Sequence, residues 1–141
     1  MTDRTLLHPP GHSRPIGRYS AGVAVDIGAG RVLVAVSGQV ATDDEGKTLG
    51  VGDPAAQAEV VFQRLSAVLD AAGGSVADLV SVIIYLTDIT HFPAISAVRD
   101  RVFADSAPAS TLVEVSRLAD PDHLVEISGT AVVHRTDRES G

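Results

Sequence analysis

The chain has 141 residues, a formal net charge of −7 and no cysteine. This length supports one compact domain and is too short for two ordinary ones. The acidic balance disfavours nucleic-acid partners, which are bound by clustered Lys and Arg, and the lack of cysteine excludes disulfides, thiolate nucleophiles and Cys-based zinc sites. The sequence lacks a run of about 18 apolar residues, and its N-terminus lacks a signal-peptide core. We therefore expect a soluble, cytoplasmic protein that binds neither membranes nor nucleic acid.

Hydrophobic patterning divides the chain into three parts. Residues 1–15 contain three prolines and no periodicity, which predicts a flexible N-terminal arm. A single domain is predicted over 16–134, followed by a C-terminal tail at 135–141. The elements expected in the domain are strands at 17–26 and 31–40 joined by a Gly28-Ala29-Gly30 turn, a helix after Asp53, a strand at 79–87, a helix at about 90–103, and strands at about 110–118 and 123–134. This order predicts an α+β fold, a mixed sheet with two helices on one face.

The two expected helices are defined by apolar stripes. In the first, Asp53 is a plausible N-cap, Pro54 fits the first turn, and Gly73-Gly74 ends the helix. The strand at 79–87 is apolar on both faces, so we expect both faces to be covered. The stripe of the first helix is Ala58, Val61, Phe62, Leu65, Val68, Leu69 and Ala72, and that of the second is Phe92, Ile95, Val98 and Val102.

The last strand predicts what lies on the second face of the sheet. Side chains alternate along a strand, so Val125 and Ile127 face the helices, while Glu126 faces away with Ser128 and Thr130. Leaving a partly apolar sheet face with a polar stripe in water is unfavourable. We expect further copies of the chain to cover it and to form pockets at the seams.

Five segments resemble the reactive intermediate deaminase family (RidA, YjgF, endoribonuclease L-PSP). They are Ile16-Gly17-Arg18-Tyr19-Ser20; Ser37-Gly38-Gln39-Val40; Leu86-Thr87-Asp88 with Phe92 after it; Pro108-Ala109-x-Thr111-x-Val113-Glu114-Val115-x-Arg117-Leu118; and Val125-Glu126-Ile127. The archetypes read I-G-P-Y-S, S-G-Q-I, L-T-D…F, P-A-R-S-x-V-E-V-x-x-L and V-E-I-E. The similarity runs in order from about residue 15 to 133.

The resemblance implies a chorismate-mutase-like fold, a homotrimer and pockets between subunits. Archetypes hydrolyse imines and enamines such as 2-aminoacrylate to a keto acid and ammonia, without a cofactor or a metal. The resemblance also implies that a pyridoxal-phosphate enzyme, or another imine-generating enzyme, acts upstream and supplies the substrate. The chemistry needs an acid/base group, a hold on the substrate and hydrogen-bond partners for the departing nitrogen.

By the resemblance, Glu126 falls on the water-activating glutamate, and Tyr19 and Ser37 on hydroxyls of the catalytic pocket. The implied substrate-binding positions are Gly38, Phe92, Ser110, Leu112 and Arg18. Gly38 matches a residue that lets backbone approach the ligand.

The sequence departs from the archetypes at Ser110, where they carry the arginine that clamps the substrate carboxylate. Ser96 likewise replaces an asparagine on the second helix. An arginine pairs with a carboxylate through charge-assisted hydrogen bonds worth about 1.5–3 kcal/mol, whereas serine offers one neutral hydroxyl. An archetypal substrate should therefore be handled at least about tenfold worse. Arg18, next to Tyr19, is a candidate substitute, although arginines beside turns are commonly solvated.

Plainer interpretations remain open for each site residue. Glu126 could be a structural carboxylate at a subunit seam, Tyr19 a packed ring, and Ser37 and Ser110 small residues in crowded strands. The histidines show no metal-ligand spacing: Pro9-Pro10-Gly11 separates His8 from His12, and His91, His123 and His134 are dispersed.

Three functions are left open. The first is an enzyme acting on an imine or enamine that does not rely on an α-carboxylate, with Glu126 as acid/base. The second is a slow 2-aminoacrylate or 2-imino acid deaminase with Arg18 or backbone amides as clamp, which an arginine reaching the pocket would support. The third is a noncatalytic trimeric binding protein, which a pocket plugged by Leu112 and Phe92 would support.

Overall fold

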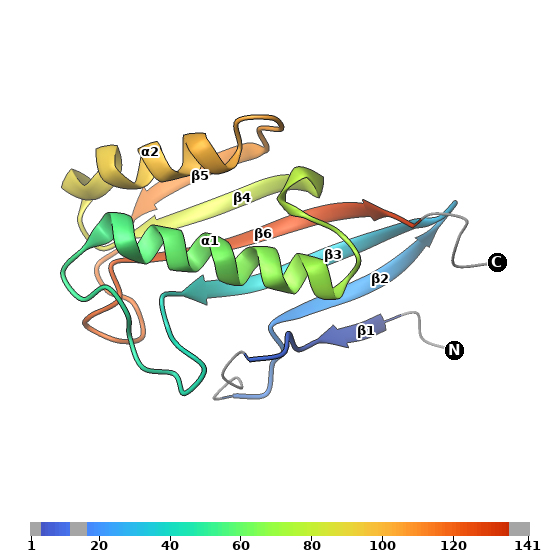
Figure 1. The fold of residues 1–141 in the computed structure, drawn as a ribbon, viewed down its shortest axis with the longest axis horizontal. Coiled ribbons are helices and arrows are strands. Elements are labelled where there is room, and N and C mark those ends of the chain that lie inside the picture. Colours follow the sequence, from blue (N-terminus) through green and yellow to red (C-terminus); the bar gives the residue numbers. More distant parts are fainter. Residues whose placement is uncertain (1–3, 12–16, 136–141) are drawn as a thin grey trace.

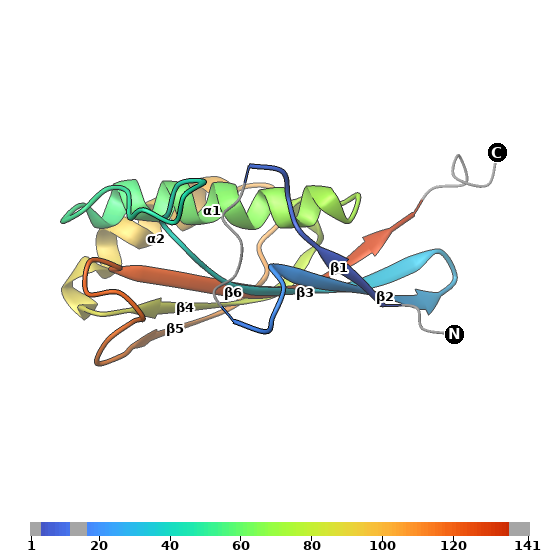
Figure 2. The same ribbon diagram turned by 90° about the horizontal axis from the view of Figure 1, so that it is seen from below.

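A computed structural model describes residues 4–11 and 17–135 and shows one sheet with two helices on the same face (Figures 1 and 2). The six strands lie in the order β1-β2-β3-β6-β4-β5. Only the β4 and β5 pair is parallel among them, so the sheet is mixed. The predicted α+β class is confirmed. The elements are β1 (Arg4–Leu7), β2 (Gly22–Gly28), β3 (Arg31–Val40), α1 (Pro54–Ala71), η1 (Val76–Asp78), β4 (Leu79–Leu86), η2 (Ile89–His91), α2 (Phe92–Val102), β5 (Ala109–Glu114) and β6 (Val125–His134).

The predicted N-terminal arm is wrong at its start, because Arg4–Leu7 forms the edge strand β1 against β2. Leu7 is buried in the core, which gives this short strand an anchor. The prolines that follow hid the strand, since four residues are too few to establish a period. The other parts of the predicted arm, residues 1–3 and 12–15, and the tail from residue 136 lie outside the described residues. In the ranges that are described, no helix is long and apolar enough to cross a membrane.

The local signals for the hairpin and first helix are confirmed. Ala29 and Gly30 both have positive φ, at 57° and 73°, as a tight hairpin turn between β2 and β3 requires. Asp53 caps α1 by accepting a hydrogen bond from the Ala56 N–H at 3.0 Å. Gly73 ends the helix with φ at 82°, and the Gly74 N–H donates to the Leu69 carbonyl at 2.9 Å.

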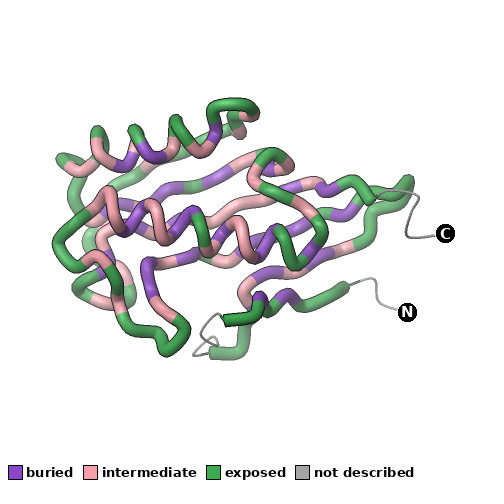
Figure 3. The backbone as a smooth tube through the Cα atoms, in the orientation of Figure 1, coloured by how far each residue is buried: buried purple, intermediate pink, exposed green. Residues whose placement is uncertain are grey.

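The core lies between the helices and one face of the sheet (Figure 3). Val34, Ile84 and Ile127 come from three adjacent strands and are fully buried there. Phe62 of α1 packs against Phe103, the cap residue directly after α2, and the two rings meet edge to face at 5.4 Å.

The second helix differs from its predicted stripe at one position. Ile95 and Val98 are buried, but Phe92 is 41% exposed. The segment begins with the separate turn η2, capped by Asp88 through the Thr90 N–H, and α2 starts at Phe92 itself. The end of the helix therefore leaves this ring at the surface rather than over the core.

The other face of the sheet carries the alternate side chains and is not covered by any described element (Figure 2). Val40, Glu126, Tyr85 and Val113 form one row across four strands, since these residues are register partners. Leu33, Ile83 and Val113 are each more than one third exposed. We call this surface the open face; it carries exposed apolar side chains, and its coverage by further copies of the chain stays a prediction.

Candidate functional site

A pocket of about 860 Å³ lies at the end of β3 that leads to α1. Its walls come from the segment before β2, the second half of β3 and the loop after it, α1, the loop before β6, and the start of β6. The pocket thus joins segments from both halves of the chain. The lining residues are Tyr19, Ala21, Ser37, Gly38, Gln39, Val40, Thr42, Asp44, Glu45, Gly46, Arg64, Ala119, Asp120, His123 and Glu126.

A β-bulge in β3 shapes this wall. Val36 pairs with Gly129, and Gln39 pairs with Ile127. Ser37 and Gly38 therefore both lie opposite one residue of β6, Ser128. The bulge interrupts the ladder beside Glu126. Bulges re-aim side chains in this way and are common next to active sites.

Glu126 packs directly against the backbone of Gly38. A Cβ on Gly38 would overlap the Glu126 carboxylate oxygen Oε2 and would lie 2.8 Å from its Cδ. Glycine is therefore required here by close approach. The carboxyl is about half-buried, and this burial raises its pKa above the ordinary value. A carboxyl of this kind keeps its proton to a higher pH and can act as an acid as well as a base.

Ser37 holds the segment that carries Tyr19. Its hydroxyl donates to the Ser20 carbonyl at 2.6 Å, and its N–H donates to the Ala21 carbonyl at 2.9 Å. Ser20 in turn donates through its hydroxyl to the Gly22 carbonyl. Tyr19 lies at the rim of the pocket, and the residue is 56% exposed. Ser37 thus uses its proton for positioning, and only its acceptor lone pairs remain for a ligand.

The structure brings Tyr19, Ser37, Gly38 and Glu126 together but leaves the other predicted site residues outside this pocket. Ser110 pairs with Val82, so it lies on the helix side of the edge strand β5. Glu126 lies on the open face, and β4 separates the two strands. Within one protomer, Ser110 and Glu126 therefore belong to opposite faces of the sheet.

Three further predicted positions also fail to line the pocket. Leu112 is paired with Ile84 and packs against the core from β5. Phe92 stands exposed at the start of α2, and Arg18 is exposed beside Tyr19. The pocket of one protomer is therefore not plugged by Leu112 and Phe92, and Arg18 is not its arginine.

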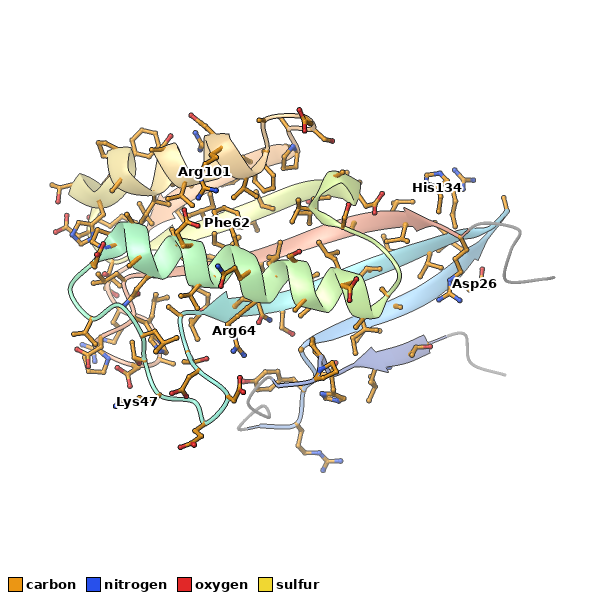
Figure 4. All side chains as sticks on the ribbon, in the orientation of Figure 1. Asp26, Lys47, Phe62, Arg64, Arg101 and His134 are labelled. Atoms are coloured by element: carbon orange, nitrogen blue, oxygen red, sulfur yellow. The ribbon has the colours of Figure 1, made fainter. Side chains whose placement is uncertain are left out.

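Arg64 reaches the pocket instead, from the middle of α1 (Figure 4). Its Nη1 donates to the Thr42 carbonyl at 3.0 Å, while its Nε is buried with no hydrogen-bond partner among the described residues. Burial lowers the pKa of Arg64, and the nearby carboxylates of Asp44 and Asp43 oppose that shift. The sequence signal was available, because Arg64 is three residues after Val61 and four before Val68, within the apolar stripe.

His123 is the second residue that the sequence reasoning missed. It lines the pocket and is buried. His123 stands two residues before Val125, so it continues the alternation of the core-facing side chains of β6. This position in the sequence is a signal for burial. Metal-ligand spacing alone gives no indication of this burial.

The charge of the lining is negative. Besides Glu126, the carboxylates of Asp44, Glu45 and Asp120 line the pocket, and Arg64 is the one permanent cation in this lining set. The arrangement therefore combines a half-buried carboxyl, a rim phenol and an acidic wall, which suits proton transfer on a neutral or cationic ligand.

The chain matches the family described as endoribonuclease L-PSP over residues 11–133. It is 36% identical over 118 residues to a RutC family protein of Pyrococcus abyssi, covering 84% of this chain and 88% of the relative. It is also 36% identical over 129 residues to Protein DfrA of Myxococcus xanthus, covering 92% and 95% of the two chains.

Solved structures show the same fold. The YjgF gene product of E. coli is 30% identical with a TM-score of 0.77, over 91% of this chain and 98% of that one. E. coli TdcF with bound serine is 28% identical with a TM-score of 0.79, over 92% and 98%. The extent of these matches confirms the resemblance expected from the motifs, and the chain belongs to the RidA, YjgF and endoribonuclease L-PSP family.

Proposed function

We propose that the protein hydrolyses an imine or enamine to a carbonyl compound and ammonia, with Glu126 as the acid/base group. The observation that carries this proposal is the half-buried Glu126 packed on the Gly38 bulge, with its pKa raised by burial. Active sites are where such perturbed carboxyls concentrate. The pocket is open beside it, so water and a small substrate can reach the carboxyl.

The reaction needs one proton transfer at each end of the C=N bond. The oxygen of water bonds to the imine carbon, and the π electrons of the C=N bond move to nitrogen, which takes up a proton. The resulting carbinolamine then collapses: the C–N bond breaks, ammonia leaves and the carbonyl forms. Glu126 exchanges protons with the water oxygen and the nitrogen, and positioned acid/base groups typically contribute about 10²–10⁴-fold to such steps.

The acidic lining favours a substrate without an α-carboxylate. A ligand carboxylate would approach Asp44, Glu45 and Asp120 along with Glu126, and like charges repel at this range. A neutral imine or a protonated iminium meets no such cost. The serine at position 110 supports the same preference, since it supplies no charge.

A 2-imino acid is the second candidate substrate, because Arg64 does reach the pocket. Its Nε is buried, so the Nη protons that the Thr42 carbonyl does not accept are the donors for such a carboxylate. Asp43 and Asp44 lie close enough to Arg64 to affect its pKa, so a substrate carboxylate would compete with them.

The proposed assembly is a homotrimer with a chorismate-mutase-like arrangement, in which the open face is buried between subunits. Its exposed Leu33, Ile83 and Val113 support this. Across a seam, β5 of one subunit would bring Ser110 toward the pocket of another. Ribonuclease activity is not proposed, since the net charge of −7 and the acidic pocket disfavour a phosphate backbone.

Ammonia release from freshly generated imines tests these proposals. One imine carries an α-carboxylate and the other lacks it, and wild type is compared with Glu126→Gln and Arg64→Gln. Glu59→Gln is the control, because Glu59 pairs with Arg101 on the helix layer, outside the pocket. The proposal requires wild-type acceleration that Glu126→Gln removes. Loss with Arg64→Gln on the carboxylate substrate alone would select the second candidate, and rates at the buffer level for both imines would refute both.

A further inference from the structure

Gln39 belongs to the Ser37-Gly38-Gln39 segment, but the proposed chemistry gives it no role. It lines the pocket and is only 5% exposed. Its Nε2 donates to the Ser37 carbonyl at 3.0 Å, which orients the amide, and its Oε1 has no hydrogen-bond partner among the described residues. Buried amide oxygens normally accept a hydrogen bond. The donor that Oε1 lacks can therefore be supplied by a ligand.

Arg64 offers a hydrogen-bond donor that complements this acceptor. Its Nη1 donates to the Thr42 carbonyl at 3.0 Å, and its Nη2 has no partner in the part of the chain that the structure describes. Three unpartnered atoms of the described lining are fully enclosed, namely the Arg64 Nε and both ring nitrogens of His123. Gln39 Oε1 and Arg64 Nη2 are not enclosed in this way, so both atoms are accessible to a ligand.

The acceptor and the donor lie on the same side of the sheet, at the same end of β3. Gln39 pairs with Ile127, whose side chain is fully buried beneath the helices, so Gln39 also points to the helix side. Arg64 extends from α1 toward this end of β3 (Figure 4) and binds the carbonyl of Thr42. Thr42 is three residues after Gln39, so their Cα atoms are at most about 11 Å apart. One small planar group can therefore meet both side chains.

We propose that Gln39 and Arg64 form a subsite for a carboxamide group, in which a C=O lies beside an N–H. The C=O of the ligand accepts from Arg64 Nη2, and its N–H donates to Gln39 Oε1. A carboxylate has no proton for Oε1 and would be repelled by Asp44 and Glu45, which also line the pocket. An ammonium group would be repelled by Arg64. The neutral amide satisfies both side chains and meets neither repulsion.

The inference rests on the proposed function in one respect, that the carboxamide is the distal part of the imine substrate. Glu126 lies on the open face and Gln39 on the helix side, but both line the pocket, and the bulge at Ser37 and Gly38 lies beside them. A pocket of about 860 Å³ has room for a ligand whose amide and C=N bond lie at opposite ends. An amide on a separate small molecule has the same chemistry, and competition distinguishes the two sources.

The test follows the side-chain amide resonances of Gln39 while propionamide is added, with propionate and propylammonium as charged probes of similar size. Propionamide should shift these resonances and bind more tightly than either charged probe. Arg64→Met should weaken its binding about tenfold or more, the effect of one lost hydrogen bond to a charged donor. Gln63→Met, at the exposed neighbouring position on α1, is the control and should bind propionamide like wild type.

Two wild-type results would overturn the subsite. One is Gln39 resonances that stay in place at the highest propionamide concentration that leaves the protein folded, and the other is tighter binding of propionate.

Hydrolysis of an imine without an amide group identifies the source of the carboxamide. Propionamide should raise KM and leave kcat unchanged, because it occupies the place of the substrate. Resonance shifts without this competition would overturn the assignment to the substrate and leave a separate amide ligand. If wild type hydrolyses neither imine, the proposed function fails, and the resonances of Gln39 still decide whether the subsite binds an amide.

Discussion

The carboxylate of Glu126 occupies the space in which a side chain at position 38 would begin. Gly38 has no Cβ, and the Glu126 Cδ lies only 2.8 Å from the point where one would stand. Because Gly38 has no positive φ, this requirement comes from contact and not from backbone strain. Gly38, the glycine of the Ser37-Gly38-Gln39 segment, is therefore needed because it leaves room for the carboxyl group of Glu126.

Gly38→Ala should destabilise the protein by about 1–3 kcal/mol, the cost of overpacking, and should displace Glu126 from its position. Urea unfolding measures the loss. The double variant Gly38→Ala/Glu126→Ala should recover most of it, because the colliding atoms are then gone. A double variant as unstable as the sum of both single variants would show that Gly38 is needed for another reason.

Glu126→Gln should remove activity and raise stability at neutral pH. The pKa of Glu126 is raised by burial, so the folded state holds this proton more tightly than the unfolded chain does. Stability from this group is complete below the unfolded pKa and is lost as pH rises through the folded pKa. The free-energy gain of Glu126→Gln over wild type should therefore grow from pH 4 to pH 8 in unfolding experiments at one protein concentration. Glu59→Gln should show no such growth.

Ser37→Ala should cost about 1–2 kcal/mol, because it leaves the Ser20 carbonyl without its 2.6 Å hydrogen bond. The segment bearing Tyr19 should loosen, seen as faster amide hydrogen exchange at Ala21 and Gly22. Activity should fall through KM more than through kcat if Ser37 only positions Tyr19. The exposed Ser116→Ala is the matched control, and a large kcat loss in Ser37→Ala would instead assign the hydroxyl a chemical role.

We expect the open face to be buried between the subunits of a trimer. Sedimentation equilibrium checks this by measuring the mass of the assembly. Ile83→Asp should dissociate the assembly, since it places a charge on the apolar open face that the proposed trimer buries. Ala97→Asp puts the same charge on the exposed side of α2 and should leave the mass unchanged. A monodisperse wild-type monomer would remove the assembly proposal.

The Ser110→Arg variant tests whether position 110 belongs to the site of the assembled protein. In one protomer Ser110 lies on the face opposite Glu126, so the new arginine can act only across a subunit seam. We expect a gain of at least about tenfold on an imine with an α-carboxylate. No gain by a variant that remains trimeric would place Ser110 outside the assembled site.

Local signals predicted the fold well because each has a local cause. The Gly28-Ala29-Gly30 turn, the Asp53 cap and the glycine stop of α1 are confirmed. The edge strand β1 escaped because its anchor, Leu7, is defined by packing against distant residues. Phe92 was misjudged because its exposure depends on where η2 ends and α2 begins.

The site was predictable only where a motif marks it. Tyr19, Ser37, Gly38 and Glu126 belong to short segments with known spacing and lie together. Arg64 lies on α1 and His123 in the loop before β6, and no short sequence motif contains both residues. Their sequence signals are indirect: Arg64 is a charge within the apolar stripe of α1, and His123 shares the alternation of the core-facing residues of β6.

The place of β6 in the sheet has a consequence for the order of assembly. It is the last described strand in the chain, yet it lies between β3 and β4 and carries Glu126. Until β6 arrives, β3 and β4 have no common neighbour, and the two halves of the sheet remain separate. Pairing of such distant segments slows folding. A chain emerging from the ribosome therefore acquires its reactive carboxyl and its completed sheet in the same event, and any shorter fragment lacks both.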